Sequence, residues 1–349
     1  MNIYRVTTNA MMYTYKNNLM SSKKRLSDAT IRVQTERSFN SYAENPAAAA
    51  RAFQLRRSHW NTCNQLESNS RVMTVFQQAE SAIDKIKNDL QNKIGDFSAL
   101  RGASDADASA RNALGQTVKA AAEGMVQLLN TKYTDNYLFA GADGLNVPFT
   151  WDEASGELLY RGVNVNAKEG TPEYEKLKEM NAETTFVDLG LGMREDSEGN
   201  PIQSTVYNTA ISGIDFLGFG EDADGDPLNA VTLMMEVSKM LCEASPEDGD
   251  WAEGSGGRER YMQLVDKLQQ STDAMLEKFV EHDAKSTFLK NNETQLTAAK
   301  DSLNIQINEV EDIDPAAAIT DLLNARYSYN AGLQIGMQIL SQSLLDYMK

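Results

Sequence analysis

The chain has 349 residues, of which 41% are hydrophobic and 24% are charged, and its formal net charge is −17. This composition supplies enough apolar side chains for a folded core and argues against wholesale disorder. Two cysteines make no disulfide framework, and the chain lacks the four ligands at short spacings that a structural zinc site needs. No apolar run approaches the roughly 18 residues of a membrane span, and the first residues lack the pattern of a cleavable secretory signal.

The charges and the turn-forming residues are concentrated in the middle of the chain. Residues 141–257 hold 24 acidic and 6 basic residues, whereas the rest of the chain holds 26 and 27. The same segment contains 16 of the 22 glycines. Because glycine favours turns and weakens helices, the sequence predicts two helical flanks around an acidic, turn-rich insert.

The N-terminal flank opens with a heptad pattern, in which apolar or small residues recur at alternating steps of three and four. Such spacing is typical of a helix that packs lengthwise against another helix. The pattern breaks at residues 38–42. The residues on this heptad line are Met12, Tyr15, Leu19, Ser22, Leu26, Ala29 and Val33.

A second helix is predicted directly after this break. Asn45 followed by Pro46 is typical of a helix cap and a first helical residue. We expect the helix to run from Ala47 to Phe97, to be interrupted at residues 102–108, and to be followed by a third helix that carries Leu114 to Leu128.

The insert favours short strands. Residues 147–151 and 158–161 flank a loop suited to a hairpin. Two further strands are expected at 184–189 and 202–207. Helices are expected at residues 174–181 and 228–243, and the whole insert is predicted to be mainly β.

The C-terminal flank mirrors the N-terminal one. A long heptad pattern spans Val265 to Val310, and Asp314-Pro315 then predicts a new cap and helix start. The last helix carries apolar residues from Leu322 to Tyr347 on one side. Because narrow apolar stripes need partners, we expect the two flanks to pair antiparallel, with the break near residue 40 beside the break near residue 314 as a hinge.

These patterns predict an α+β fold that is mainly α: a long antiparallel helical bundle built from both chain ends, with an inserted mainly β domain. Three parts are expected. Residues 1–39 with 314–349 form a terminal helical pair, residues 40–140 with 258–313 form a longer bundle, and residues 141–257 form the acidic insert. Apolar surface left over on the terminal pair would mark an interface, so assembly is its expected use.

No catalytic, cofactor or metal site is predicted. His59 and His282 lie on predicted long helices and are expected to be ordinary packed or exposed residues. Asp222, Asp224 and Asp226 alternate like the start of a calcium loop, but Pro and Leu occupy the positions where that loop requires Gly and Glu. The first 60 residues are basic, yet they lack interleaved aromatic residues, so we interpret them as a solvated helix face and expect neither nucleic-acid nor membrane binding.

Several segments resemble a known family. The run Asn136-Tyr137-Leu138-Phe139-Ala140-Gly141 resembles the flagellin-like hook-associated protein 3 family. Residues 45–52 are similar to the segment that opens the family's long helix, although Glu44-Asn45 replaces two aspartates. Residues 310–319 resemble its acidic joint, and residues 329–333 and 339–347 resemble its closing helix, a motif shared with flagellin.

The resemblance implies a subunit of a helical ring at the junction between hook-associated protein 1 and the flagellin filament. Such a subunit is exported without a cleavable signal, acts outside the cell in the bacterial flagellum, and has an export chaperone at its C-terminal helices. We expect the terminal helices to pack within and between subunits. The assembly-interface residues predicted on this basis are Met12, Tyr15, Leu19, Leu26, Leu322, Tyr329, Leu333, Leu340, Leu344 and Tyr347.

Three other interpretations stay open at this stage. The nearest is flagellin itself, because both families share the end motifs. An export-linked factor or enzyme on a coiled-coil stalk would need a functional cleft in the insert. A long-helix signalling or membrane-surface protein would need a hydrophobic anchor, and the sequence offers none near its basic segment.

Overall fold

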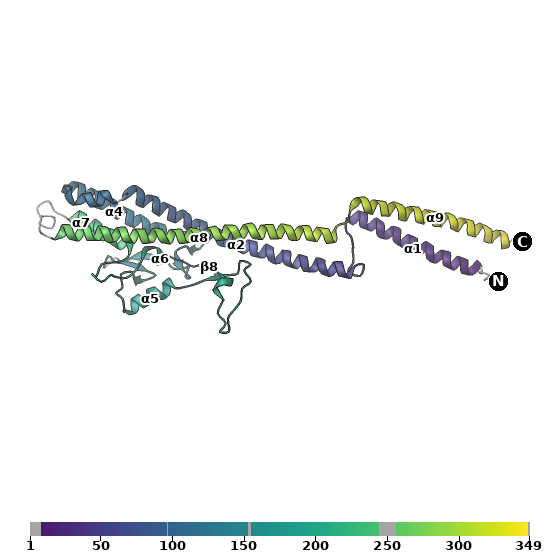
Figure 1. Ribbon diagram of the computed structural model, residues 1–349, viewed down its shortest axis with the longest axis horizontal. Helices are drawn as coiled ribbons and strands as arrows, with labels where there is room; N and C mark the ends of the chain where they lie inside the picture. The colour runs from purple at the N-terminus through teal and green to yellow at the C-terminus, as the bar shows by residue number, and fades with distance from the viewer. Residues whose placement is uncertain (1–7, 96, 153–154, 244–255, 348–349) are drawn as a thin grey trace. The chain divides into compact units, whose positions relative to one another are not determined.

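The computed structural model describes residues 8–95, 97–152, 155–243 and 256–347, with the side chains of residues 8–9, 243 and 339–347 outside that description. Figure 1 shows that helices dominate the chain. The helices are α1 (Thr8–Thr35), α2 (Pro46–Lys93), α3 (Ser98–Gly102), α4 (Ala108–Leu129), α5 (Pro172–Asn181), α6 (Gly213–Leu217), α7 (Ala230–Glu243), α8 (Gly257–Glu311) and α9 (Pro315–Tyr347), with short 3-10 helices at Ala103–Asp105 and Gln203–Thr205. The predicted mainly helical α+β architecture with a strand-containing insert is confirmed.

The strands are short and form small antiparallel sheets. They are β1 (Lys132–Tyr133), β2 (Asn136–Tyr137), β3 (Ala140–Gly141), β4 (Phe149–Trp151), β5 (Leu158–Tyr160), β6 (Val163–Asn164), β7 (Phe186–Val187), β8 (Tyr207–Asn208) and β9 (Ile211–Ser212). Their pairings are β1 with β2, β3 with β9, β4 with β5 and β6, and β7 with β8.

Contacts divide the chain into two compact units, which we describe separately. Unit 1 comprises residues 1–63 and 297–349, and unit 2 comprises residues 64–296. The helices α2 and α8 contribute residues to both. The three-part division expected from the sequence stays a prediction.

In unit 1, α1 and α9 run antiparallel side by side, with the two chain ends at the same end of the pair (Figure 1). We call α1 and α9 the terminal pair. The helix starts predicted at the two breaks are confirmed. Asn45 Oδ1 accepts a hydrogen bond from the Ala48 amide at 3.1 Å, and Asp314 Oδ1 accepts one from the Ala316 amide at 2.9 Å. Both caps satisfy amides that a helix start leaves without partners.

One helix boundary and one strand differ from the sequence prediction. The helix α2 ends at Lys93 and not at Phe97, because Gly95 has a φ of 68° and Phe97 a φ of 65°, which lie in the left-handed region. The predicted strand at 202–207 is also wrong in its first part. Residues 203–205 form a 3-10 turn, and β8 begins only at Tyr207.

The predictions for the hairpin, for two helices and for a strand within 184–189 are confirmed, although α5, α6 and α7 hold more residues of the insert than its strands do. The hairpin pairs Phe149 with Tyr160 and Trp151 with Leu158. Helices α5 and α7 cover the two segments where helices were expected, and β7 lies within 184–189. The short helix α6 was not anticipated.

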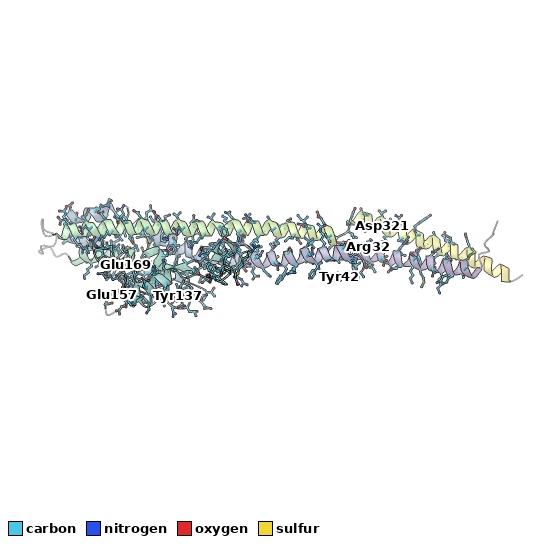
Figure 2. All side chains as sticks on the ribbon, turned by 60° about the horizontal axis from the view of Figure 1, so that its bottom comes forward. Arg32, Tyr42, Tyr137, Glu157, Glu169 and Asp321 are labelled. Atoms are coloured by element: carbon cyan, nitrogen blue, oxygen red, sulfur yellow. The ribbon has the colours of Figure 1, made fainter. Side chains whose placement is uncertain are left out.

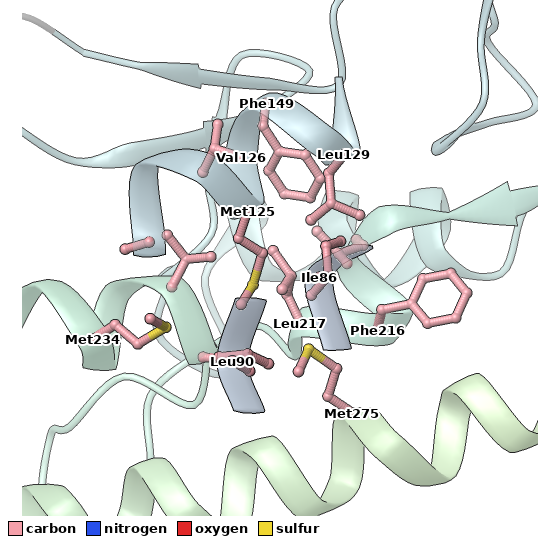
Figure 3. Packing of buried hydrophobic residues seen from close by; sticks show 14 of the residues in the cluster. Ile86, Leu90, Met125, Val126, Leu129, Phe149, Phe216, Leu217, Met234 and Met275 are labelled. Atoms are coloured by element: carbon pink, nitrogen blue, oxygen red, sulfur yellow. The ribbon is translucent and has the colours of Figure 1, made fainter. Parts of the chain in front are cut away.

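The core of unit 2 is continuous between the insert and the long helices. Figure 3 shows Ile86 and Leu90 of α2, Met125 of α4, Phe149 of β4 and Leu217 of α6 in one buried cluster. The insert therefore does not have a separate core of its own, because its apolar side chains share one cluster with the bundle helices.

The helices α4 and α7 approach closely at a glycine. Gly115 is buried, and a Cβ placed on it would lie 3.0 Å from the Leu241 Cβ. The Ser238 hydroxyl donates a 2.7 Å hydrogen bond to the Gly115 carbonyl. A larger residue at position 115 would have to separate the two helices.

Candidate assembly site

One face of α1 is half-buried along its whole described length. Met12, Tyr15, Leu19 and Leu26 lie on this face, while the residues between them are mostly exposed. The full set is the heptad line expected from the sequence, with Thr30 added: Met12, Tyr15, Leu19, Ser22, Leu26, Ala29, Thr30 and Val33. The prediction that this line is a helix-packing seam is confirmed by its contact with α9.

The matching line on α9 also follows heptad steps but contains smaller residues. Gly336 is buried, and a Cβ added to it would overlap the phenol ring of Tyr15. A Cβ at Gly332 would lie 3.4 Å from Leu19 Cδ1, which is ordinary contact. Glycine thus allows the two backbones to approach where large α1 side chains cross. The seam residues of α9 are Ala318, Leu322, Ala325, Tyr329, Gly332 and Gly336.

The predicted interface residues fall into three groups. Six of them line the seam and are half-buried: Met12, Tyr15, Leu19, Leu26, Leu322 and Tyr329. Leu333 does not lie in the seam and is 40% exposed, and its place in an interface between subunits stays a prediction. The side chains of Leu340, Leu344 and Tyr347 lie outside the described residues.

The breaks near residues 40 and 314 lie next to each other, as expected. The Ser38 amide donates to the Glu311 carbonyl at 2.7 Å, and the Ile313 amide donates to the Glu36 carbonyl at 3.2 Å. We call this contact the joint. A hinge role for it stays a prediction.

A buried carboxylate holds the joint together. Glu311 is 6% exposed, and its Oε2 accepts hydrogen bonds from Arg37, at 2.5 Å, and from Arg56. Arg37 lies in the break itself and Arg56 on α2. One carboxylate therefore connects three segments of unit 1, and the two guanidinium groups offset the cost of burying its charge.

The terminal pair exposes much apolar surface and buries little. Among the described side chains of α1 and α9, no large hydrophobic side chain is fully buried. In contrast, unit 2 buries large side chains such as Phe76 and Tyr261 almost completely. The exposed large hydrophobic residues of the pair are Met11, Tyr13, Met20, Ile31, Ile319, Leu323, Tyr327, Leu333, Ile335 and Met337.

The three neighbouring aspartates Asp222, Asp224 and Asp226 form ion pairs with basic residues of α8. Lys267 Nζ lies 2.6 Å from Asp222, 2.9 Å from Asp224 and 2.5 Å from Asp226. Arg260 forms a two-pronged pair with Asp226, and these contacts lower the pKa of Asp226 to about 2 despite its burial. The Lys267 ammonium group therefore occupies the position between the three carboxylates where a metal ion would bind.

The two histidines differ in their surroundings. His282 is 4% exposed and stacks on Phe76 with ring centroids 5.0 Å apart, and its Nε2 has no hydrogen-bond partner among the described atoms. Burial lowers the pKa of His282 to about 4. His59 has Cys63 one turn later on α2, with Sγ 3.8 Å from Nδ1, a contact that was not predicted from the sequence.

The run that carries the family resemblance lies where the chain enters the insert. Leu138, Phe139 and Ala140 are buried, and Gly141 has a φ of 73°. The Phe139 carbonyl accepts a 2.8 Å hydrogen bond from the Gly213 amide and a 3.1 Å bond from the Tyr160 hydroxyl. This run therefore connects α4 to the sheets of the insert. No helix in the described part of the chain is long and apolar enough to cross a membrane.

The chain is similar to known flagellar proteins in part of its sequence and in its fold. Residues 6–143 match the model of the bacterial flagellin N-terminal helical region. A solved structure from Vibrio parahaemolyticus, described as that of a flagellar hook-associated protein, is similar in fold with a TM-score of 0.56 and 11% identity, covering 77% of this chain and 100% of its own. No curated protein matches the chain.

Two further solved structures have lower TM-scores. FlgL of Bacillus cereus has a TM-score of 0.43 and 16% identity over 73% of this chain and 99% of its own. FlgL of Xanthomonas campestris has a TM-score of 0.40 and 12% identity over 76% of this chain and 99% of its own. Residues 6–143 are thus similar to the flagellin N-terminal helical region, and the chain shares its fold with the Vibrio parahaemolyticus structure.

Proposed function

We propose that the chain forms the junction between hook-associated protein 1 and the flagellin filament, where copies assemble through their terminal helices. The observation that supports this most is the apolar surface of the terminal pair. Tyr13 is 70% exposed, Leu323 59% and Met337 66%, and a helix pair that leaves such residues in water is complete only with partners. The seam residues from Met12 to Tyr329 then hold the pair itself together.

The choice of a junction protein over flagellin rests on the resemblance at Tyr137 to Gly141. A junction protein and flagellin would occupy different positions in the flagellum. In the source bacterium, antibodies against the insert should label one short zone between hook and filament. Labelling along the whole filament would support flagellin instead.

A deletion strain tests the same proposal independently. Cells that lack this chain should build hooks, release flagellin into the medium and carry no filaments, and the intact gene should restore them. Normal filaments in the deletion strain would contradict the junction role. A strain lacking flagellin is the control, because it should keep this chain on its hooks.

Export without a cleaved signal and a chaperone at the C-terminal helices complete the proposal. Mass spectrometry of the protein sheared from cells should then find the N-terminal segment uncleaved, apart from removal of Met1. The chaperone is expected to co-purify with the full chain from cytosol and to be lost when residues 315–349 are deleted. A signal-sized truncation would contradict the proposed export route.

A further inference from the structure

The half-buried side chains of His59 and Cys63 face each other on α2, outside the terminal pair. Cys63 Sγ lies 3.8 Å from His59 Nδ1 and 3.9 Å from His59 Nε2. Positions four apart on a helix are neighbours on one face, and metal-binding helices use the same spacing for their ligands. Imidazole nitrogen and thiolate sulfur are both metal ligands. A metal ion is therefore the kind of ligand that this pair fits.

The helix holds the two side chains at this spacing. It runs unbroken over Pro46–Lys93, and Figure 2 shows its side chains along the whole length. Thr62 is buried and Trp60 is 65% exposed, whereas His59 and Cys63 have intermediate exposure. The pair therefore lies at the edge of the buried face of α2, where an ion can reach it from solvent without unfolding of the helix.

The separation of the sulfur and the nitrogens matches two metal–ligand bonds. Bonds of about 2.3 Å to sulfur and about 2.0 Å to nitrogen place the ligand atoms roughly 3.6 Å apart at a tetrahedral ion and roughly 4.3 Å apart at a linear one. The observed distances of 3.8 and 3.9 Å lie between these limits. Because the two nitrogens are almost equally far from Sγ, the ring has to turn until one of them faces the ion.

The number of ligands selects the ion. Among the described residues, the one group of three His, Cys, Asp or Glu side chains whose ligand atoms converge within 4.8 Å is Asp222, Asp224 and Asp226. His59 and Cys63 thus have no third ligand of these types in place. Zinc sites in proteins use three or four side chains. Copper(I) is a soft ion that binds thiolate and imidazole, and it is stable with two ligands in a nearly linear arrangement.

The nearby charges also favour a monovalent ion. Arg56 and Arg57 precede His59 by less than one turn of α2. When Cys63 binds copper(I), its thiol proton passes to solvent, the sulfur–copper bond forms and the copper stays in the +1 state, so thiolate and ion together are neutral. A divalent ion would leave a net positive charge near the two guanidinium groups, at a cost in Coulomb energy.

We propose that His59 and Cys63 bind one copper(I) ion, with Sγ and one imidazole nitrogen as its two protein ligands. The bound ion connects two successive turns of α2. It stabilises the folded helix, because the unfolded chain does not hold the two ligands together. The proposal concerns α2 alone and does not depend on the junction role.

The chain supplies its own control, because it has one other cysteine. Cys242 is also half-buried, but its Sγ has the Gln116 amide as a neighbour at 3.6 Å and not an imidazole. Cys63→Ser and His59→Gln each remove one proposed ligand with little change in size, and a hydroxyl or amide is a poor ligand for a soft ion. Cys242→Ser is the matched control. Circular dichroism should show equal helix content in all three variants.

A competition titration gives the readout. The reduced full chain is titrated with copper(I) under anaerobic conditions against a chromophoric copper(I) chelator. Wild type and Cys242→Ser should bind one ion per chain with equal affinity. Cys63→Ser and His59→Gln should each raise the Kd at least about tenfold, since loss of even an outer partner of a metal ligand costs about 10–100-fold. X-ray absorption of the wild-type complex should show one sulfur and one nitrogen neighbour.

Other outcomes overturn the proposal. Unchanged affinity in His59→Gln would show that a thiol alone binds the ion, and an equal loss in Cys242→Ser and Cys63→Ser would show binding without a defined site. Wild-type chain that binds zinc(II) more tightly than copper(I), or that loses copper(I) to the chelator as readily as Cys63→Ser, also rules it out. The position of the chain in the flagellum tests the junction role separately.

Discussion

Gly336 of α9 lies directly against the phenol ring of Tyr15 of α1, with no space for a Cβ between them. Four residues earlier, Gly332 faces Leu19 at an ordinary contact distance. The two glycines are one helical turn apart in the same seam, yet only one of them is required by the packing. They therefore offer a matched pair of substitutions.

We expect Gly336→Ala and Gly332→Ala to have opposite effects on the terminal pair. The first must displace the Tyr15 ring and should cost about 1–3 kcal/mol. The second should stabilise α9 by up to about 1 kcal/mol, because alanine favours the helix and its Cβ fits. Limited proteolysis within α1, followed by mass spectrometry, measures the difference. Equal protection in both variants would mean that the seam is looser than the structure shows.

The joint should depend on the charge of Glu311. Glu311→Gln leaves Arg37 and Arg56 without their shared carboxylate, and we expect a loss of about 1–3 kcal/mol in local stability. Hydrogen exchange at the Ser38 and Ile313 amides reports on it, since both amides form the joint. Glu309→Gln is the control, because Glu309 is exposed. Unchanged exchange in Glu311→Gln would show that backbone hydrogen bonds alone hold the joint.

The buried His282 should make unit 2 sensitive to acid. Its pKa is about 4 in the folded chain against an ordinary value of 6.5, so unfolding takes up a proton that the folded state excludes. Stability is therefore complete above pH 6.5 and decreases as the pH falls towards 4, by about 3 kcal/mol. Denaturant unfolding at pH 7 and pH 4.5 measures this change.

His282→Leu should remove much of that pH dependence, and His59→Gln should retain it. Both comparisons use the difference between the two pH values, so a general loss of stability in either variant cancels. The prediction fails if His282→Leu loses as much stability on acidification as the wild type.

Lys267 and Lys278 of α8 should differ in how much they stabilise unit 2. Lys267 contacts three aspartates, of which Asp226 is 2% exposed, whereas Lys278 contacts the half-buried Asp215 at 3.2 Å. We expect Lys267→Met to destabilise unit 2 by about 2–4 kcal/mol, because it leaves buried negative charge without its ammonium partner. Lys278→Met should cost less than about 1 kcal/mol. Urea unfolding of both variants tests the ranking, and equal costs would refute it.

The sequence by itself determined which residues share a helix face. The steps from Met12 to Val33 fixed the α1 seam, since a helix repeats at 3.6 residues and a narrow stripe has one way to face a partner. Asn45 and Asp314 fixed two helix starts, because their side chains satisfy amides close to them in the chain. Composition alone indicated where the turn-rich, strand-containing segment lies.

Only the tertiary structure decided which of two apolar lines on α9 meets α1. Leu333 and Tyr329 both fit heptad spacing, and the backbone approach at Gly336 selects the line with Tyr329. Likewise, Glu311 and Arg37 are 274 positions apart, and Lys267 of α8 reaches Asp226 in the loop before α7. Periodicity and capping act within a few turns, so contacts between distant segments depend on how closely the helices approach.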